Sequence, residues 1–218
     1  MNAPLLQLLV LAAIAVFLIL RLKNVLGTRD GFEKPVAPRV LDEKPRRSFE
    51  VIEGGPDHDI VDHVEDGSRA AKALAAMKRA EPSFGVADFL QGARGAYEMI
   101  LMGFERGDLD PVKGFMAPEV YDAFNEVVEA RRAKGLTVEA DFAGLREMTI
   151  GDASFDEPTG LAEITLRFTA EITSVVRDAS GAIVEGEVGK PKRIKDVWTF
   201  ARSMGADDPN WELVATGE

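Results

Sequence analysis

Three side chains have the types and spacing that chemistry requires. His58 and His63 lie in the run HDIVDH, where imidazole and carboxylate groups together resemble a set of metal ligands. Two histidines five residues apart do not share a helix face, so we expect no metal site there. Asp196 precedes the apolar run VWTF. A carboxyl group in a dry cleft can act as a general base, because burial raises its pKa towards neutrality.

Composition excludes most other chemistry. The 218 residues include no cysteine, which removes thiolate nucleophiles, disulfides and cysteine-ligated zinc. Neither the glycine-rich phosphate-binding motifs nor G-x-S-x-G occurs, so we expect no cofactor and no catalytic residue. The formal net charge of −11 repels phosphate backbones and argues against nucleic acid as a partner.

Alternating strands are the elements that would position Asp196. Residues 161–173 (LAEITLRFTAEIT) alternate apolar with polar side chains and predict a long strand with one buried face. Further strands are predicted at 137–155, 182–187, 193–203 and 210–216, with turns at 178–181 and 186–191. The basic stretch GKPKR at 189–193 is interpreted as a solvated hairpin tip. Asp196 shares its strand parity with Trp198 and Phe200, so these three side chains face the same way.

Helices precede these strands. Apolar residues recur at helical spacing from Val86 to Phe104, and a second amphipathic stretch follows Pro118 and ends near Gly135. A short helix is predicted to begin at Asp110, before Pro111. This order indicates an α+β domain at 83–218, with helices packed on one face of a curved antiparallel sheet and room for an apolar cleft. The residues assigned to that pocket are Phe104, Phe168, Trp198, Phe200 and Trp211.

The first 22 residues have the character of a transmembrane anchor. No charged residue occurs from Ala3 to Leu20, and a helix of that length nearly spans a hydrocarbon core of about 30 Å. The segment lacks the basic start and the small-residue cleavage site of a signal peptide. Residues 21–47, which follow this segment, contain eight Lys or Arg and four Asp or Glu. The first three of the basic residues are Arg21, Lys23 and Arg29. The positive-inside rule then places the remaining chain in the cytoplasm, as in a single-pass protein of the bacterial inner membrane.

A flexible acidic linker is predicted at 23–67, followed by a basic amphipathic helix at 68–82 with Ser68 as its N-cap. The helix carries basic and apolar residues on opposite sides: Arg69, Lys72, Lys78 and Arg79 against Leu74 and Met77. Two interpretations stay open. The helix rests on anionic lipid headgroups, or its small apolar face docks on the domain that follows.

Longer stretches of the chain resemble a known family. The helix and turn FLQGARGAYEMILMGFERGDLDPVKGFMAPEVYDAF, followed by AEITLRFTAEIT, VWTFARS and DPNWELVAT, occur in the order seen in the C-terminal domain of subunit forty-four of the mitochondrial inner-membrane protein translocase and its bacterial, membrane-anchored relatives. The resemblance covers roughly residues 68–218. It implies a cone-shaped domain similar to nuclear transport factor two, with a large apolar pocket, and association with anionic lipid and translocase components. The segment by which the mitochondrial protein recruits a heat-shock chaperone has no counterpart here.

Three functions follow as hypotheses. The first is a membrane-anchored, non-enzymatic adaptor that binds protein, lipid or both, with a link to protein transport or membrane-protein assembly. The second is a carrier of a lipid or another apolar molecule. The third is a pocket enzyme of the isomerase or dehydratase type that uses Asp196, although fold alone does not establish activity. The identity of any protein client is not readable from the sequence.

Overall fold

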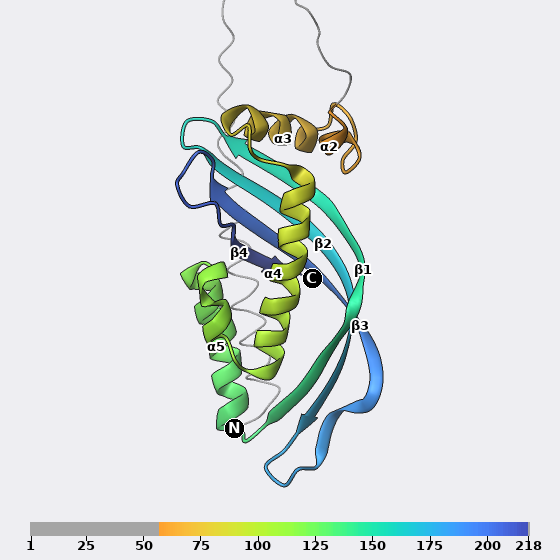
Figure 1. Ribbon diagram of the computed structural model, residues 1–218. Helices are drawn as coiled ribbons and strands as arrows, with labels where there is room; N and C mark the ends of the chain where they lie inside the picture. The colour runs from red at the N-terminus through yellow and green to blue at the C-terminus, as the bar shows by residue number, and fades with distance from the viewer. Residues whose placement is uncertain (1–56, 218) are drawn as a thin grey trace, which may run out of the picture. The chain divides into compact units, whose positions relative to one another are not determined.

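The computed structural model describes residues 57–217, in which helices precede a single four-stranded antiparallel sheet with strand order β1-β2-β3-β4 (Figure 1). The α+β class predicted from the sequence is therefore confirmed. The elements in chain order are α2 (His58–Val61), α3 (Arg69–Ala80), α4 (Val86–Arg106), the 3₁₀ helix η1 (Asp110–Phe115), α5 (Pro118–Ala133), β1 (Thr137–Asp156), β2 (Leu161–Arg177), β3 (Ile183–Ser203) and β4 (Glu212–Gly217).

Local sequence signals account for the ends of the helices. The Ser68 hydroxyl accepts a hydrogen bond from the Ala71 N–H at 3.0 Å, which confirms the predicted N-cap of α3. Helix α4 ends at Gly107, whose φ of 73° lies in the left-handed region that glycine adopts without strain. Pro118 occupies the first turn of α5, where a missing N–H costs nothing.

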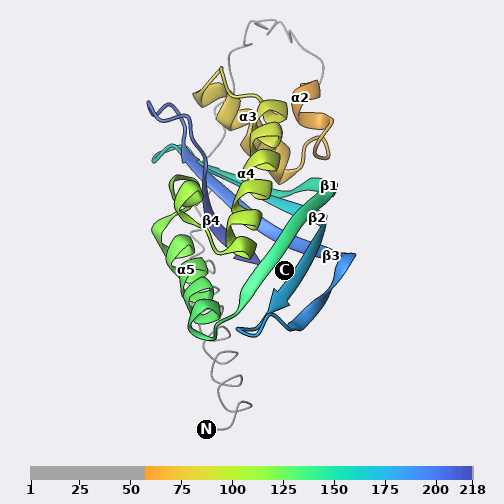
Figure 2. The same cartoon turned by 60° about the horizontal axis from the view of Figure 1, so that its bottom comes forward.

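The sheet is long and bent. Strand β1 pairs with β2 through three register shifts, between Phe142 and Gly144, between Leu145 and Glu147 and at Ile150/Asp152. Each extra residue bends the strand and increases its twist. The sheet consequently curves around α4, while α4 and α5 lie on the same side of it (Figures 1 and 2).

Strand β3 differs from the prediction of two strands separated by a turn at 186–191. It is one strand from Ile183 to Ser203, and GKPKR lies within it rather than at a hairpin tip. The register explains the difference: Thr173 of β2 pairs with Pro191 and Val175 with Gly186, so the residues between bulge out of the ladder. Gly186, with a φ of 84°, permits the bulge. The glycine and proline residues at 186–191 thus form a bulge, and the strand continues after it.

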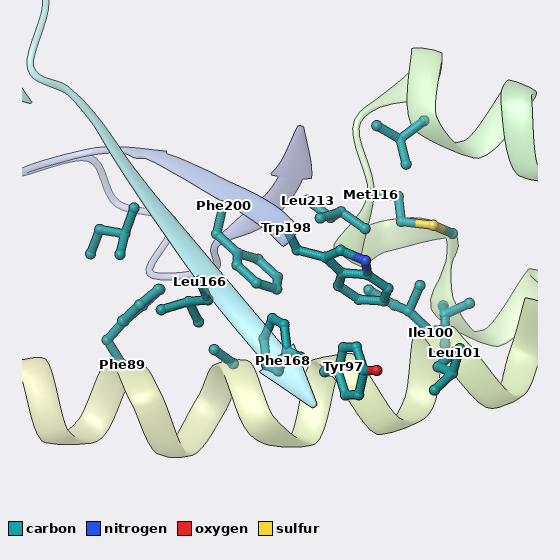
Figure 3. Close-up of a cluster of buried hydrophobic side chains, with 14 of the residues drawn as sticks. Phe89, Tyr97, Ile100, Leu101, Met116, Leu166, Phe168, Trp198, Phe200 and Leu213 are labelled. Carbon is teal, nitrogen blue, oxygen red and sulfur yellow. The ribbon is translucent and has the colours of Figure 1, made fainter. Parts of the chain in front are cut away.

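The core lies between the inner face of the sheet and α4. Alternate residues of β2 from Ala162 to Ile172 are buried, as their two-residue period predicts. They meet side chains of α4, of which Tyr97 and Ile100 are fully buried (Figure 3). Tyr97 stacks on Phe168 with ring centroids 4.1 Å apart and an interplanar angle of 5°. These contacts fix α4 over β2 and β3.

Residues 57–67, the last part of the predicted linker at 23–67, pack against the helices that follow. Ile60 of α2 is buried in the core, and the Asp59 carboxylate accepts hydrogen bonds from the Val86 and Ala87 N–H groups at 2.8 and 2.9 Å. These are otherwise unpaired donors in the first turn of α4. Lys78 of α3 pairs with Asp59 at 2.9 Å. The last part of the predicted linker is thus folded onto the domain.

Candidate functional site

An aromatic pocket of about 440 Å³ opens beside α4. We give this name to the cavity whose aromatic walls are Phe84, Phe89, Phe115, Phe200 and Trp211. The Phe89 and Trp211 ring centroids lie 4.6 Å apart, and Phe89 meets Phe200 edge-on at 6.2 Å. The walls come from the loop before α4, from α4, η1 and β3, and from the residue before β4, so the pocket exists only in the folded domain. Such walls suit an apolar occupant.

The side of the pocket formed by α4 is lined by small residues. Gly92, Ala93 and Ala96 contribute there, with the half-exposed Met99 at the edge. A Cβ added at Gly92 would meet no heavy atom within 4 Å, so packing does not require glycine at this position. Glycine inside a helix is less stable than alanine by roughly 0.5–1 kcal/mol. A side chain at position 92 would extend into the pocket, so this glycine keeps the cavity open.

One end of the aromatic pocket is polar. The guanidinium of Arg202 bonds to the Glu81 carboxylate at 2.5 Å and to the Pro209 carbonyl at 2.9 Å, and it lies over the Trp211 ring. The backbone N–H of Gly205 lowers the pKa of Glu81, and Arg202 adds to this effect against the opposing effect of burial. Glu81 is therefore ionised near neutral pH.

The Nε of Arg202 is buried and has no hydrogen-bond partner among the described residues. A buried donor without an acceptor costs free energy. An acceptor oxygen brought into this end of the pocket, by water or by an occupant, would relieve that cost.

A second cavity of about 780 Å³ lies beside β3, beyond its last pair with β4. We call it the sheet-edge pocket. Its walls come from α4, α5, β3 and β4: Leu101, Phe104, Glu105, Phe124, Arg193, Ile194, Lys195, Asp196, Trp198, Thr216 and Gly217. Aromatic rings and charged groups thus share one cavity.

Asp196 is half-buried at the sheet-edge pocket and accepts a hydrogen bond from the Tyr97 hydroxyl at 2.6 Å. Burial raises the pKa of Tyr97, and the adjacent carboxylate raises it further. The phenol therefore remains protonated and donates to Asp196. This pair links α4 to β3 across the core and provides no phenolate base.

The predicted pocket residues do not share one cavity. Phe200 and Trp211 line the aromatic pocket, whereas Phe104 and Trp198 line the sheet-edge pocket. Phe168 is 1% exposed and belongs to the core, stacked on Tyr97. Strand parity predicts that Trp198 and Phe200 share one face and that Phe168 lies on the buried face of its own strand, and the structure places all three on the inner face of the sheet. Parity does not reveal how the helices divide the space above that face.

The predicted membrane-surface residues of α3 do not all face solvent: some are buried and others are exposed. Leu74 and Met77 are fully buried, and α3 packs against β1. Lys78 pairs with Asp57 and Asp59. In this structure the apolar face of α3 is docked on the domain, which is the second of the two interpretations.

The remaining basic residues of α3 lie on its solvent side. Arg69 pairs with Asp152, and Lys72 and Arg79 are exposed. Their side chains remain accessible to an anionic surface.

Several predictions fall outside the described residues. The anchor at 1–22, the linker up to residue 56 and the flanking Arg21, Lys23 and Arg29 all lie in that part of the chain. Within 57–217 no helix combines the length and hydropathy of a membrane span. Within the same range no group of three or more His, Cys, Asp or Glu could hold a metal ion. The Nδ1 atom of His58 lies 3.7 Å from Oδ1 of Asp62.

Sequence reasoning missed the residues that shape the aromatic pocket, chiefly Phe84, Phe89, Gly92 and Arg202. Phe89 was assigned to the buried face of a helix, which is correct but does not distinguish core from pocket. Gly92 carried a usable signal, because a glycine inside a strongly periodic helix calls for an explanation. No sequence pattern indicated Arg202, because its ionic partner Glu81 is far away in the sequence.

Three comparisons relate this chain to known proteins. The model of the family described as "Tim44-like domain" matches residues 70–218. The human mitochondrial import inner membrane translocase subunit TIM44 is 23% identical over 159 residues, which are 72% of this chain and 35% of that protein. The chain thus spans about a third of the length of this relative.

Two solved structures are also similar, and both are of low identity. The intermembrane space region of the chloroplast protein ARC6 has a TM-score of 0.40 at 10% identity, covering 60% of this chain and 94% of that one. A periplasmic fragment of TraM has a TM-score of 0.39 at 9% identity, covering 58% and 94%. At these scores neither structure carries information about function.

Proposed function

Because this chain belongs to the Tim44-like domain family, we propose that it is a membrane-anchored, non-enzymatic adaptor whose domain holds a protein partner at the membrane. The aromatic pocket carries this proposal. It is open, walled by five aromatic side chains and kept clear at Gly92. Buried aromatic pockets of this kind anchor apolar side chains of partner proteins. The human relative is by name a subunit of a mitochondrial import translocase, which motivates a link to protein transport.

The finer location is part of the same proposal. The uncharged run from Ala3 to Leu20 anchors the chain in the bacterial inner membrane, and the basic residues that follow keep the domain in the cytoplasm. The exposed basic face of α3 adds attraction to anionic lipids, through Lys72 and Arg79. Together they would concentrate the domain near the membrane surface, where an adaptor meets its client.

A carrier function is the second candidate, and the apolar lining of the aromatic pocket favours it. A carrier would hold a lipid or another apolar small molecule instead of a side chain of a partner. An enzymatic function has less support, because the Asp196 carboxylate already accepts a hydrogen bond from the Tyr97 hydroxyl, which itself stays protonated.

Photo-crosslinking in cells separates these functions. The probe replaces Met99 in the full-length chain, because Met99 is 47% exposed and lines the aromatic pocket, whereas Phe200 is 1% exposed and a probe there would disturb the core. Discrete protein adducts identified by mass spectrometry support the adaptor. Adducts with lipids or small molecules alone support the carrier and overturn the adaptor.

A matched pair of variants assigns the adducts to the pocket. Gly92→Leu extends a side chain into the cavity and should abolish the adducts, because a Cβ at position 92 meets no neighbour that would deflect it. Gly92→Ala adds only one methyl group and should retain them. Equal adduct yields from both variants would place the contact outside the aromatic pocket.

A further inference from the structure

The basic stretch Lys190–Lys195 (KPKRIK) lies along an edge of the sheet. Strand β3 pairs with β2 over Pro191–Ser203, but it pairs with β4 only over Val197–Ala201. Within the described residues, Pro191–Lys195 therefore pairs with a strand on one side alone, through β2. An edge of this kind is a template for an added strand.

The backbone of this edge suits strand addition. Pro191 pairs with Thr173 of β2 and has no N–H to donate. Proline within a sheet lies where its nitrogen faces away from the neighbouring strand. Backbone groups alternate in direction along a strand. Arg193 and Lys195 therefore turn their N–H and C=O groups to the same outer side as Pro191. These two residues supply the donors and acceptors that an incoming strand needs.

The sheet-edge pocket adjoins the same residues. Ile194 and Asp196 face the inner side, as Trp198 does, and the pocket there is walled by Phe104 and Phe124. A strand laid beside Pro191–Lys195 would direct every second side chain towards this cavity, because side chains alternate between the faces of a sheet. Apolar side chains at those positions would contact the two phenylalanines.

The outer face of the edge is basic. Arg193 pairs with Glu171 at 3.2 Å and Lys190 with Glu187 at 3.0 Å. Lys192 shares the parity of Ile194 and faces the inner side, so Arg193 and Lys195 are the cations of the outer face, and no ion pair within the described part of the chain involves Lys195. Four cations within six residues contrast with a net charge of −11 for the whole chain. Charge complementarity therefore favours acidic side chains on the incoming strand. A second copy of this edge is disfavoured, because antiparallel self-pairing would place the basic side chains of Arg193 and Lys195 opposite those of the other copy.

We propose that the outer edge of β3 at Pro191–Lys195 binds an extended segment of a partner protein as an added strand. Alternate apolar side chains of that segment enter the sheet-edge pocket, and the intervening acidic side chains lie beside Arg193 and Lys195. This inference deepens the proposed adaptor function and rests on it, since it names a second contact and the chemistry of the client segment that makes it.

Binding of a defined peptide tests the strand pairing. The probe is a short fluorescent peptide that alternates Phe and Glu, titrated against the full-length chain and followed by anisotropy. A peptide of the same composition with Phe and Glu grouped should bind less tightly. N-methylation of alternate backbone amides should abolish binding, because it removes the donors of the added strand. Equal affinity of the methylated and unmethylated peptides would overturn strand addition.

Charge variants test the basic face. Lys195→Glu should weaken binding by about threefold to tenfold, since an exposed attraction becomes a repulsion, while Lys195→Arg should leave it unchanged. Lys72→Glu on α3 makes the same charge change away from the pocket and serves as the control. Hydrogen exchange at the Arg193 and Lys195 amides should slow when the peptide binds. A loss of affinity in Lys72→Glu equal to that in Lys195→Glu would contradict a local role of this edge.

Crosslinking in cells distinguishes failure of this inference from failure of the adaptor function. Probes at Lys195 and at Met99 are compared in separate full-length chains. Protein adducts from both positions support the inference. Protein adducts from Met99 with none from Lys195 would overturn strand addition and leave the adaptor intact. Absence of protein adducts from both, or lipid adducts alone, would overturn the adaptor and with it the inference.

Discussion

At the scale of single residues, the hydrogen bond between Tyr97 and Asp196 links α4 to β3. Tyr97→Phe deletes the donor and leaves a half-buried carboxylate short of a hydrogen bond. We expect the free energy of unfolding to fall by about 1–3 kcal/mol, measured by urea denaturation. The control is Tyr121→Phe, whose hydroxyl is 3.5 Å from Asp110 at an exposed site and should matter little. Equal decreases in the free energy of unfolding for the two variants would show that the Tyr97 hydrogen bond stabilises the fold no more than an exposed one does.

Gly92 provides a second prediction at this scale. Gly92→Ala should raise the free energy of unfolding by roughly 0.5–1 kcal/mol, because it removes the entropic penalty of a helical glycine without creating a clash. Gly107→Ala is the contrasting variant: its φ of 73° is strained for alanine, so the free energy of unfolding should fall by about 1–2 kcal/mol. Thermal and urea denaturation measure both. A destabilised Gly92→Ala would mean that the glycine serves the fold and not the pocket.

Strand parity predicted from sequence that Asp196, Trp198 and Phe200 face the same side, and the structure agrees. The phenol that completes the polar pair could not be predicted, because Tyr97 is 99 residues away. Parity fixes which residues share a face. It says nothing about which helix covers that face, and both pockets lie in the space between.

At the scale of elements, α3 distinguishes docking on the domain from resting on lipid. Leu74→Ala should lower the free energy of unfolding by about 2–5 kcal/mol, because the side chain is fully buried. Lys72→Glu should leave the stability unchanged and weaken binding to anionic vesicles, since Lys72 is exposed. If instead Leu74→Ala preserved the stability and impaired vesicle binding, α3 would lie on the membrane by its apolar face.

Asp59 joins α2, α3 and α4 and makes that junction sensitive to acid. Partial burial raises its pKa, but hydrogen bonds from Lys78 and from the Ala87 and Val86 N–H groups outweigh this and lower the pKa to about 2. A carboxyl group with a lowered pKa in the folded state stabilises the fold above its unfolded pKa, which is near 4. That contribution is lost as the pH falls from about 4 to 2. Asp59→Asn should therefore flatten the pH dependence of the free energy of unfolding in this window, measured by urea denaturation at several pH values.

The elements that periodicity could predict are those whose partners are local or repeat at a fixed spacing. Helices α4 and α5 and strand β2 were read correctly because their apolar residues recur at one period over many positions. Sequence predicts a linker at 57–67, because the packing of this stretch depends on Asp59 reaching the first turn of α4, 27 residues away. The bulge in β3 was read as a turn, because glycine and proline signal a local bend whether or not the strand resumes.

At the scale of the whole molecule, the proposed function depends on combining a membrane anchor with a domain that has two open contacts. The aromatic pocket and the basic edge of β3 are built from different residues, apart from their common strand. Two weak contacts on one rigid domain, held at a surface, bind a client more tightly than either contact alone. The acidic chain as a whole would be repelled by anionic lipid, so an uncharged anchor is needed to keep the domain at the membrane.

Fractionation of bacterial cells tests this arrangement. The full-length chain should sediment with membranes and resist extraction at alkaline pH, because an apolar run of this length inserts through the hydrocarbon core. A tag after Glu218 should be protected when protease is added to spheroplasts and digested after lysis, as expected for a cytoplasmic domain. Replacing Arg21, Lys23 and Arg29 with Gln should expose the tag in a fraction of the molecules, because the charge bias that sets orientation is reduced. Extraction of the unaltered chain by alkaline buffer would show that it is peripheral, and digestion of its tag in intact spheroplasts would reverse the orientation. Either result would remove the cytoplasmic adaptor as the function of this chain.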